Sequence, residues 1–248
     1  MSKNVLVTGG GRGIGAATAK LLASQGWRVC INYVSQAQAA QSVADDITRA
    51  GGQAWTVAAD VAQPDQVQRL FEFVDREMGA LHGLVNNAGV IAPMMRFEDM
   101  EPARWAHIVG TNLLGTMMCA REGVRRMSSR HGGAGGAIVN LSTALTRSGA
   151  PSMYVDYAAA KSGIETLTVG LAREVAADGV RVNCVRPGLI DTEIHASGGD
   201  AQRASKAKGF VPLQRAGQAQ EVAQAIAWLL SEQASYTTGS FIDVSGGV

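Results

Sequence analysis

Short apolar runs alternate along the whole chain with longer segments in which apolar residues recur every three or four positions. An uninterrupted apolar run of four to eight residues is typical of a strand buried on both faces, and the longer period is typical of an amphipathic helix. We predict strands at residues 5–7, 28–32, 54–57, 84–86, 137–141, 180–185 and 240–244. We predict helices at residues 15–25, 37–49, 64–78, 102–127, 155–177 and 219–230.

This alternation predicts the fold class. Helices placed between buried strands cover both faces of a parallel sheet. We therefore expect an α/β fold of the Rossmann type, a doubly wound parallel sheet of about seven strands flanked by helices. The length of 248 residues fits a single domain over residues 1–248. Residues 187–210 form the one long segment without periodicity, and we expect a substrate lid there, because such loops in compact domains are usually functional.

Composition narrows the function classes. The net charge of +1 gives no electrostatic reason to expect a nucleic acid or an anionic membrane surface as partner. The N-terminus lacks a signal-peptide pattern, and no apolar stretch approaches the roughly 20 residues that a membrane span needs. The three cysteines are odd in number and form no Cys-x-x-Cys pair. Together these features predict a cytoplasmic protein with buried, reduced cysteines.

A glycine-rich segment directly follows the first predicted strand. It reads Thr8-Gly9-Gly10-Gly11-Arg12-Gly13-Ile14-Gly15 and opens the first predicted helix. Glycine permits a tight turn and lets backbone N–H groups approach a pyrophosphate, which the helix N-terminus attracts electrostatically. Its position at the first strand–helix junction predicts a dinucleotide-binding site.

Tyr157 and Lys161 lie one helical turn apart in the predicted helix 155–177, so their side chains share a face. A phenol with its usual pKa of about 10 is a poor acid or base at neutral pH. A neighbouring ammonium stabilises the phenolate and lowers that pKa, which makes the pair a candidate for proton transfer with a substrate oxygen. Tyr154 has no lysine one turn after it, and we expect it to be pocket wall.

Four motifs together resemble the short-chain dehydrogenase/reductase family. They are Thr-Gly-x-x-x-Gly-x-Gly at 8–15, Asn86-Asn87-Ala88-Gly89, Tyr157-Ala-Ala-Ala-Lys161, and Pro187-Gly188 after the sixth predicted strand. They occur in the family's order, and the chain is similar to the branch labelled glucose 1-dehydrogenase-like or 3-oxoacyl-[acyl-carrier-protein] reductase-like. The resemblance implies an NAD(P)-dependent oxidoreductase, commonly a homotetramer, that moves a hydride between NADP(H) and a small alcohol or carbonyl substrate of the sugar, ketone or 3-oxoacyl type. Tyr157 would be its general acid/base.

The resemblance also assigns the other catalytic roles. The family's substrate-binding serine stands at the end of the fifth strand, where this chain has Ser142-Thr143. Thr143 occupies the position of that serine, and Ser142 is the other candidate. A threonine hydroxyl makes the same hydrogen bond, but its methyl group restricts rotamers and crowds the substrate. Asn112 matches the family's helix asparagine, which supports a water leading to the lysine, and Lys161 would also hold the nicotinamide ribose.

Cofactor choice is expected at the end of the second predicted strand, where Asn32-Tyr33-Val34-Ser35 contains no acid that would repel a 2′-phosphate. Arg12 could pair with that phosphate, so we predict NADP, with NAD as the alternative. Asp60-Val61 matches the family's adenine contact, although Asp60 could equally cap a helix. The predicted cofactor-binding residues are Gly9, Gly11, Arg12, Gly13, Ile14, Gly15, Asn32, Tyr33, Asp60, Val61, Asn86, Ala88, Gly89, Tyr157, Lys161, Pro187, Gly188, Ile190 and Thr192.

Other functions are less well supported by the sequence. No two of the four histidines have metal-ligand spacing, so we expect no catalytic metal. His195 lies in the expected lid, where we expect it at the surface, with a contact to substrate as the alternative. The alternative function is a catalytically weak NADP(H)-binding regulator of the same fold. The departure at Thr143 is its only support, because the Tyr157–Lys161 pair is intact. Substrate identity stays open.

Overall fold

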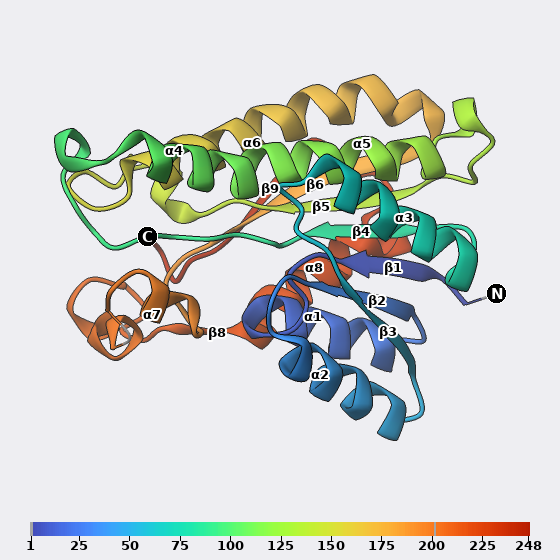
Figure 1. The fold of residues 1–248 in the computed structure, drawn as a ribbon, viewed down its shortest axis with the longest axis horizontal. Coiled ribbons are helices and arrows are strands. Elements are labelled where there is room, and N and C mark those ends of the chain that lie inside the picture. Colours follow the sequence, from blue (N-terminus) through green and yellow to red (C-terminus); the bar gives the residue numbers. More distant parts are fainter. Residues whose placement is uncertain (1, 201) are drawn as a thin grey trace.

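The computed structural model describes residues 2–200 and 202–248, and its centre is a seven-stranded sheet in the order β3-β2-β1-β4-β5-β6-β9 (Figure 1). Every neighbouring pair of strands in this sheet is parallel. The strands are β1 (Asn4–Val7), β2 (Arg28–Tyr33), β3 (Gln53–Ala58), β4 (Gly83–Asn86), β5 (Gly136–Leu141), β6 (Val180–Pro187) and β9 (Phe241–Val244). The predicted fold class, a doubly wound parallel sheet, is confirmed.

Helices cover both faces of the sheet (Figure 1). One face carries α1 (Gly13–Ser24), α2 (Ala37–Arg49) and α8 (Ala219–Leu230). The other carries α3 (Pro64–Met78), α4 (Pro102–Val109), α5 (Gly115–Met127) and α6 (Val155–Val175). Within residues 2–200 and 202–248, no helix combines the length and apolar character needed to cross a membrane.

Two apolar cores result from the alternation of side chains along each strand. In β1, Val5 and Val7 join the core under α1, α2 and α8, whereas Leu6 joins the core under α3, α5 and α6. Every residue of β1 and β4 is buried, as expected for strands that are covered on both faces. The expectation that every strand is buried on both faces is wrong for β3 and β9. These strands are partly exposed because each forms an edge of the sheet.

The predicted helix at 102–127 is interrupted by a π-helical segment, Gly110–Leu114. Its buried Asn112 donates a hydrogen bond from Nδ2 to the Ile108 carbonyl four residues back, at 2.8 Å. A side chain that competes for a helix carbonyl disturbs the regular ladder, and such π segments are frequent at functional sites. The predicted helix at 155–177 ends at Val175 and continues as a 3-10 turn, Ala176–Asp178.

Residues 187–210 contain more regular structure than their sequence predicts. Strand β7 (Ile190–Asp191) pairs in parallel with β8 (Gly217–Gln218), and α7 (Ile194–Ser197) and a 3-10 helix (Arg203–Gly209) follow β7. Position 201, inside this segment, lies outside the described residues. The segment lies beyond the carboxyl ends of the central strands, where open parallel sheets bind their ligands (Figure 1).

The core assignment predicts the stability of matched variants. Phe71 on α3 is fully buried, so Phe71→Ala should lower the free energy of unfolding by about 3–5 kcal/mol. Tyr236 is fully exposed, and Tyr236→Ala should change it by less than about 0.5 kcal/mol. Urea denaturation of both variants measures the difference. Equal losses would contradict the placement of the core.

Candidate active site

Two adjoining cavities open at the carboxyl ends of the central strands. The apolar cavity, of about 300 Å³, lies over the ends of β5 and β6 and is framed by α6 and the 187–210 segment. The glycine-loop cavity, of about 360 Å³, lies over the ends of β1, β2 and β3. Residues that line both cavities are Ile14, Asn87, Gly89, Thr192 and Ile194. A ligand that extends past this common wall would reach from one cavity into the other.

The glycine loop forms a cradle that larger residues would fill. Gly9 and Gly13 have φ angles of +61° and +52°, a conformation that L side chains rarely adopt. A Cβ atom on Gly15 would lie 2.4 Å from the Gly9 carbonyl oxygen, so glycine is needed there for close packing rather than for lining a cavity. Among the described residues, no side chain caps the first turn of α1, whose N–H groups therefore suit a pyrophosphate. Of the loop's predicted residues, those lining the glycine-loop cavity are Gly9, Gly11, Arg12, Gly13 and Ile14.

Asn32 lies beneath the glycine-loop cavity instead of in its wall. It is 1% exposed, its Oδ1 accepts a hydrogen bond from the Gly9 N–H at 3.3 Å, and its Nδ2 donates to the Ala59 carbonyl at 2.8 Å. The side chain therefore braces the glycine loop. The wall at the end of β2 is formed by Tyr33 and by the residues after it, Val34, Ser35 and Gln36.

At the end of β4, as at the end of β2, the predicted asparagine is buried and does not lie in the cavity wall. Asn86, predicted to contact cofactor, is buried and donates to Asn140 Oδ1 at 2.9 Å. Asn87, which the sequence prediction omitted, lines both cavities and donates to the carbonyls of Thr8 and Gly9, each at 2.9 Å. Successive residues at a strand end point to opposite sides, and this rule could have identified Asn87. Ala88 and Gly89 line the glycine-loop cavity as predicted.

Asp60 and Val61 also line the glycine-loop cavity. Asp60 Oδ1 accepts a hydrogen bond from the Ala62 N–H at 2.9 Å, which closes a tight turn after β3. The residue at the N-cap of α3 is Gln63, so the helix-capping interpretation of Asp60 is wrong. The turn and a contact with a bound molecule are compatible, because both residues face the cavity.

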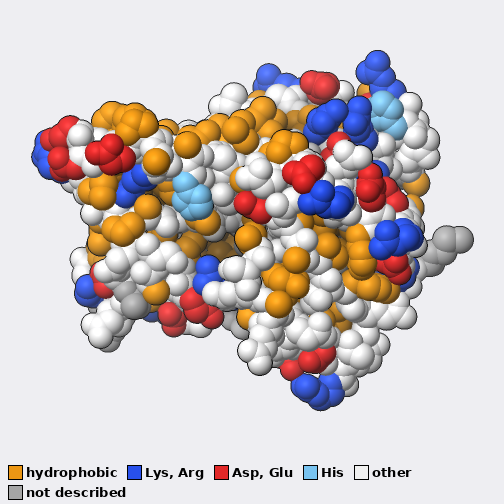
Figure 2. Space-filling model, viewed as in Figure 1, with side chains coloured by type: hydrophobic (Ala, Val, Ile, Leu, Met, Phe, Trp, Pro, Cys, Tyr) orange, Lys and Arg blue, Asp and Glu red, His pale blue; other side chains and the backbone are white. Residues whose placement is uncertain are grey.

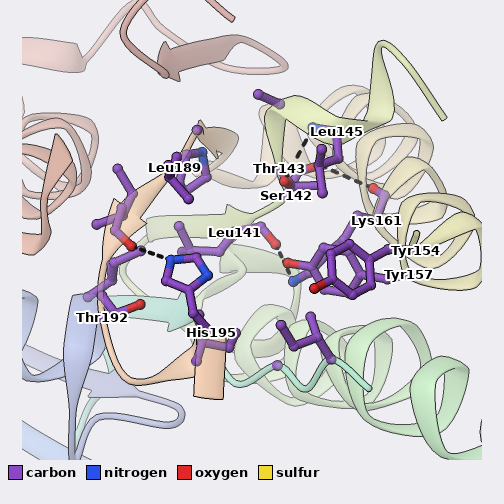
Figure 3. A pocket seen from close by; sticks show the side chains of 18 of the residues that line it. Leu141, Ser142, Thr143, Leu145, Tyr154, Tyr157, Lys161, Leu189, Thr192 and His195 are labelled. Atoms are coloured by element: carbon purple, nitrogen blue, oxygen red, sulfur yellow. Dashed lines mark hydrogen bonds between the residues drawn. The ribbon is translucent and has the colours of Figure 1, made fainter. Parts of the chain in front are cut away.

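Tyr157, Lys161, Ser142 and Thr143 come together in the wall of the apolar cavity (Figure 3). The first two lie on the first turns of α6, and the other two directly follow β5. Lys161 Nζ donates to the Leu141 carbonyl at 2.7 Å and lies 5.7 Å from the centroid of the Tyr157 ring. The structure therefore unites residues that are predicted from two distant motifs.

Burial dominates the protonation of this pair. Burial raises the pKa of Tyr157 above its usual value, and the nearby Tyr154 raises it further. Burial also lowers the pKa of Lys161 to about 8. The expectation that the tyrosine pKa is lowered is thus wrong for this structure, in which burial raises it and the Lys161 Nζ donates to a strand-end carbonyl. A raised pKa favours the protonated phenol of Tyr157.

The two candidate hydroxyls after β5 have different partners. Ser142 Oγ donates to Glu165 Oε1 at 2.8 Å. Thr143 Oγ1 accepts from the Leu145 N–H at 3.3 Å, which leaves the threonine hydrogen for a ligand in the cavity. Glu165 in turn accepts two hydrogen bonds from Arg186, at 2.8 and 2.7 Å. The sequence prediction missed Glu165, although it lies one helical turn after Lys161.

Asn112 reaches the site only across the backbone at Gly89. Its side chain is fully buried, donates to the Val90 carbonyl at 2.9 Å and accepts from the Val90 N–H at 3.2 Å. A Cβ atom on Gly89 would lie 2.9 Å from Asn112 Oδ1 and 3.5 Å from Lys161 Nζ. Asn112 therefore fixes the backbone of Gly89 and Val90, which lies between the Asn112 side chain and Lys161.

The segment after β6 supplies the opposite wall of the apolar cavity. Predicted residues that line it are Pro187, Gly188, Ile190 and Thr192. His195 is partly exposed and lines the cavity too, with Nε2 2.7 Å from the Ile190 carbonyl oxygen (Figure 3). It belongs to α7, which folds over the cavity. Tyr154 is pocket wall, as predicted, and donates to the Gly198 carbonyl at 3.3 Å.

Comparisons with known proteins cover nearly the whole chain. A family model described as enoyl-(acyl carrier protein) reductase matches residues 9–248. An uncharacterized oxidoreductase of Escherichia coli, YgfF, is 53% identical over 242 residues, or 98% of each chain. A 3-oxoacyl-[acyl-carrier-protein] reductase of Staphylococcus aureus, FabG, is 35% identical over 250 residues, which cover 100% of this chain and 98% of that one. The crystal structure of a short-chain type dehydrogenase/reductase from Mycobacterium marinum has a TM-score of 0.91 at 32% identity, over 98% of this chain and 94% of the other.

The buried lysine predicts a pH-dependent stability. Because its pKa falls from 10.5 to about 8 on folding, the unfolded chain binds more protons between these pH values. The free energy of unfolding of the wild type should therefore rise by roughly 1–3 kcal/mol relative to Lys161→Met as the pH increases from 7 to 10. Urea denaturation at several pH values measures this, with the exposed Lys20→Met as control. If the difference in the free energy of unfolding between the wild type and Lys161→Met did not change with pH, Lys161 would not be desolvated.

Proposed function

Because the chain belongs to the short-chain dehydrogenase/reductase family, we propose that it transfers a hydride between NADP(H) and a small alcohol or carbonyl substrate, with Tyr157 as general acid/base. The observation that carries the proposal is the adjacency of the two cavities. One has a glycine cradle at a helix N-terminus, and the other has Tyr157, Lys161 and Thr143 in its wall. Their common wall would bring a cofactor ring and a substrate carbonyl together.

The glycine-loop cavity suits NADP. The N–H groups at the start of α1 would bind the pyrophosphate, and Gly9 and Gly13 let the backbone approach it closely. Arg12 and Ser35 line the same cavity and would bind the 2′-phosphate as cationic and hydroxyl donors. In this arrangement the bound cofactor would supply the hydride. The residues that directly follow β2 and line the cavity, Val34, Ser35 and Gln36, include no carboxylate that would repel the phosphate.

In the apolar cavity, two hydroxyls act on the substrate oxygen, and Lys161 supports them. Thr143 donates its free hydroxyl hydrogen to that oxygen, and Tyr157 donates its proton when the carbonyl is reduced. The raised pKa of Tyr157 keeps this proton in place until the oxygen becomes basic. Lys161 holds the cofactor ribose and stabilises the phenolate that forms. Oxidation of an alcohol follows the same steps in reverse.

The surroundings of the site suggest three further features. We propose that residues 187–210 act as a lid, because α7 and the 3-10 helix Arg203–Gly209 cover the apolar cavity. We propose a homotetramer, since apolar side chains are exposed along α5 and the π segment before it, among them Leu114 (49%) and Met117 (44%) (Figure 2). The three buried cysteines fit a reducing cytoplasm, the proposed location.

Removal of the Tyr157 hydroxyl tests the proton transfer. Tyr157→Phe should reduce NADPH-dependent turnover of a ketone by at least about 100-fold, because the general acid is lost. It should bind NADPH as the wild type does. Tyr154→Phe is the matched control, and it should retain turnover because that hydroxyl bonds to the Gly198 carbonyl. Steady-state rates and NADPH fluorescence titrations measure the two properties.

The outcomes separate the two candidate functions. Unchanged turnover in Tyr157→Phe would remove Tyr157 from the mechanism. A wild-type protein that binds NADPH but turns over none of a wide panel of ketones, sugars and 3-oxoacyl thioesters would instead favour the regulatory alternative.

Arg12 tests the choice of cofactor. Loss of a charged hydrogen bond costs about 1.5–3 kcal/mol, so Arg12→Ala should weaken NADPH binding roughly 10- to 100-fold. NADH binding should change by less than about threefold, because it lacks the phosphate that Arg12 would bind. Fluorescence titrations of both cofactors provide the measurement. Equal weakening of the two would mean that Arg12 does not read the 2′-phosphate.

A further inference from the structure

One cation in the apolar cavity has no role in the proposed hydride transfer. Arg203, in the 3-10 helix Arg203–Gly209, lines the cavity, and its guanidinium carbon lies 5.6 Å from the centroid of the Tyr154 ring. The hydrogen-bond partners of its guanidinium are two sulfur atoms. Nη1 lies 3.3 Å from Met94 Sδ, and Nη2 lies 3.8 Å from Met153 Sδ.

These contacts leave the guanidinium poorly satisfied. It has five N–H donors, and a thioether is only a weak acceptor. Nearby cations are paired differently, since Lys206 bonds to Asp200 at 2.8 Å and Arg215 to Glu221 at 2.7 Å. For Arg203, by contrast, no ion pair within 4.0 Å is formed with any residue in the described ranges. The nearest acid on the same segment is Asp200, whose pKa the charge of Arg203 helps to lower, but its carboxylate bonds to Lys206 and not to Arg203. The guanidinium donors of Arg203 therefore remain available to an acceptor from outside the chain.

The charges around the cavity also favour an anionic ligand. Within residues 2–200 and 202–248, its ionisable side chains are those of Tyr154, Tyr157, Lys161, His195 and Arg203, and no aspartate or glutamate side chain lines it. Val248 also lines it, and its main-chain oxygen accepts a hydrogen bond from Arg147 at 3.4 Å. The rest of the wall is mostly aliphatic or aromatic, so an anion near Arg203 would be held in surroundings of low dielectric constant.

We propose that the substrate is an oxo acid whose carboxylate binds Arg203 while its carbonyl lies at Tyr157. The inference rests on the proposed function, because it names the substrate class of that same site. A guanidinium presents parallel donors that match a carboxylate. The apolar residues Ile91, Leu145 and Met153, which pack with Tyr154 and Tyr157, contact the carbon chain between the two groups.

The position of Arg203 also constrains the spacing of these groups. Its contact is with Tyr154, one helical turn before Tyr157. The carboxylate would therefore lie beyond the Tyr154 ring and away from the reacting carbon. Acids whose carbonyl is separated from the carboxylate by methylene groups, such as acetoacetate and levulinate, should fit better than pyruvate, in which the two groups are adjacent.

The test compares each acid with its methyl ester, which has nearly the same shape and no charge. With NADPH as reductant, wild-type kcat/KM should be higher for levulinate than for methyl levulinate. In Arg203→Met the ratio of acid to ester should fall about 10- to 100-fold, as expected for loss of a charged hydrogen bond. Arg203→Lys should recover part of the ratio, and Lys20→Met, a change at an exposed lysine outside the cavity wall, should keep it.

Two results would overturn the inference. One is a wild-type enzyme that reduces acid and ester equally well, and the other is an acid-to-ester ratio that Arg203→Met leaves unchanged. In the latter case Arg203 would serve only to pack on Tyr154, and both substrates would lose activity together.

A second measurement does not depend on turnover. Calorimetric titration of the protein with pentanoate, which has no carbonyl to reduce, should show binding that is lost in Arg203→Met and absent for pentanol. If the wild type reduced no ketone but bound pentanoate through Arg203, the proposed reaction would fail and the anion site would stand. If ketones were reduced but pentanoate did not bind, the anion site would fail and the reaction would stand.

Discussion

The site depends on one buried contact, the hydrogen bond from Lys161 Nζ to the Leu141 carbonyl. It ties the first turns of α6 to the end of β5, and so fixes Tyr157 relative to Thr143. A buried ammonium is costly without an acceptor, so this geometry is strongly preferred once the sheet has formed. The same burial lowers the pKa of Lys161 and raises that of Tyr157. Burial of the pair therefore determines both the positions of Lys161 and Tyr157 and the direction of their pKa shifts.

Two ion pairs support this contact from opposite sides. Arg186 binds Glu165, which accepts hydrogen bonds from Ser142 and Thr146, and this links β6 and α6 to the turn after β5. Arg104 on α4 binds Asp156, whose carboxylate is 2% exposed and also accepts from the Tyr157 N–H. Removal of one partner from a buried pair leaves an uncompensated charge, so the Arg104–Asp156 pair constrains the helix that carries Tyr157 more strongly than the partly exposed Arg186–Glu165 pair.

The sequence predicted the sheet and its helices well because the hydrophobic period is set by burial, which is similar in all parallel sheets. It predicted less well wherever side-chain direction mattered. At the ends of β2 and β4, one residue points into the protein interior and the next points into the cavity. The sequence does not show which of the two faces the cavity, so it predicted the buried Asn32 and Asn86 as cofactor contacts and did not predict Asn87. Contacts between distant segments, such as Glu165 with Arg186 and Arg203 with Tyr154, have no local period that could reveal them. Nor does the sequence show that α7 folds over the cavity with His195.

The central claim is that cofactor and substrate meet where the two cavities join. A crystal structure of the protein with NADPH tests this most directly. The account predicts the 2′-phosphate beside Arg12, the pyrophosphate at the start of α1, and the nicotinamide ring between Tyr157 and the Pro187–Thr192 wall. A nicotinamide bound away from Tyr157, or NADPH bound outside the glycine-loop cavity, would contradict it.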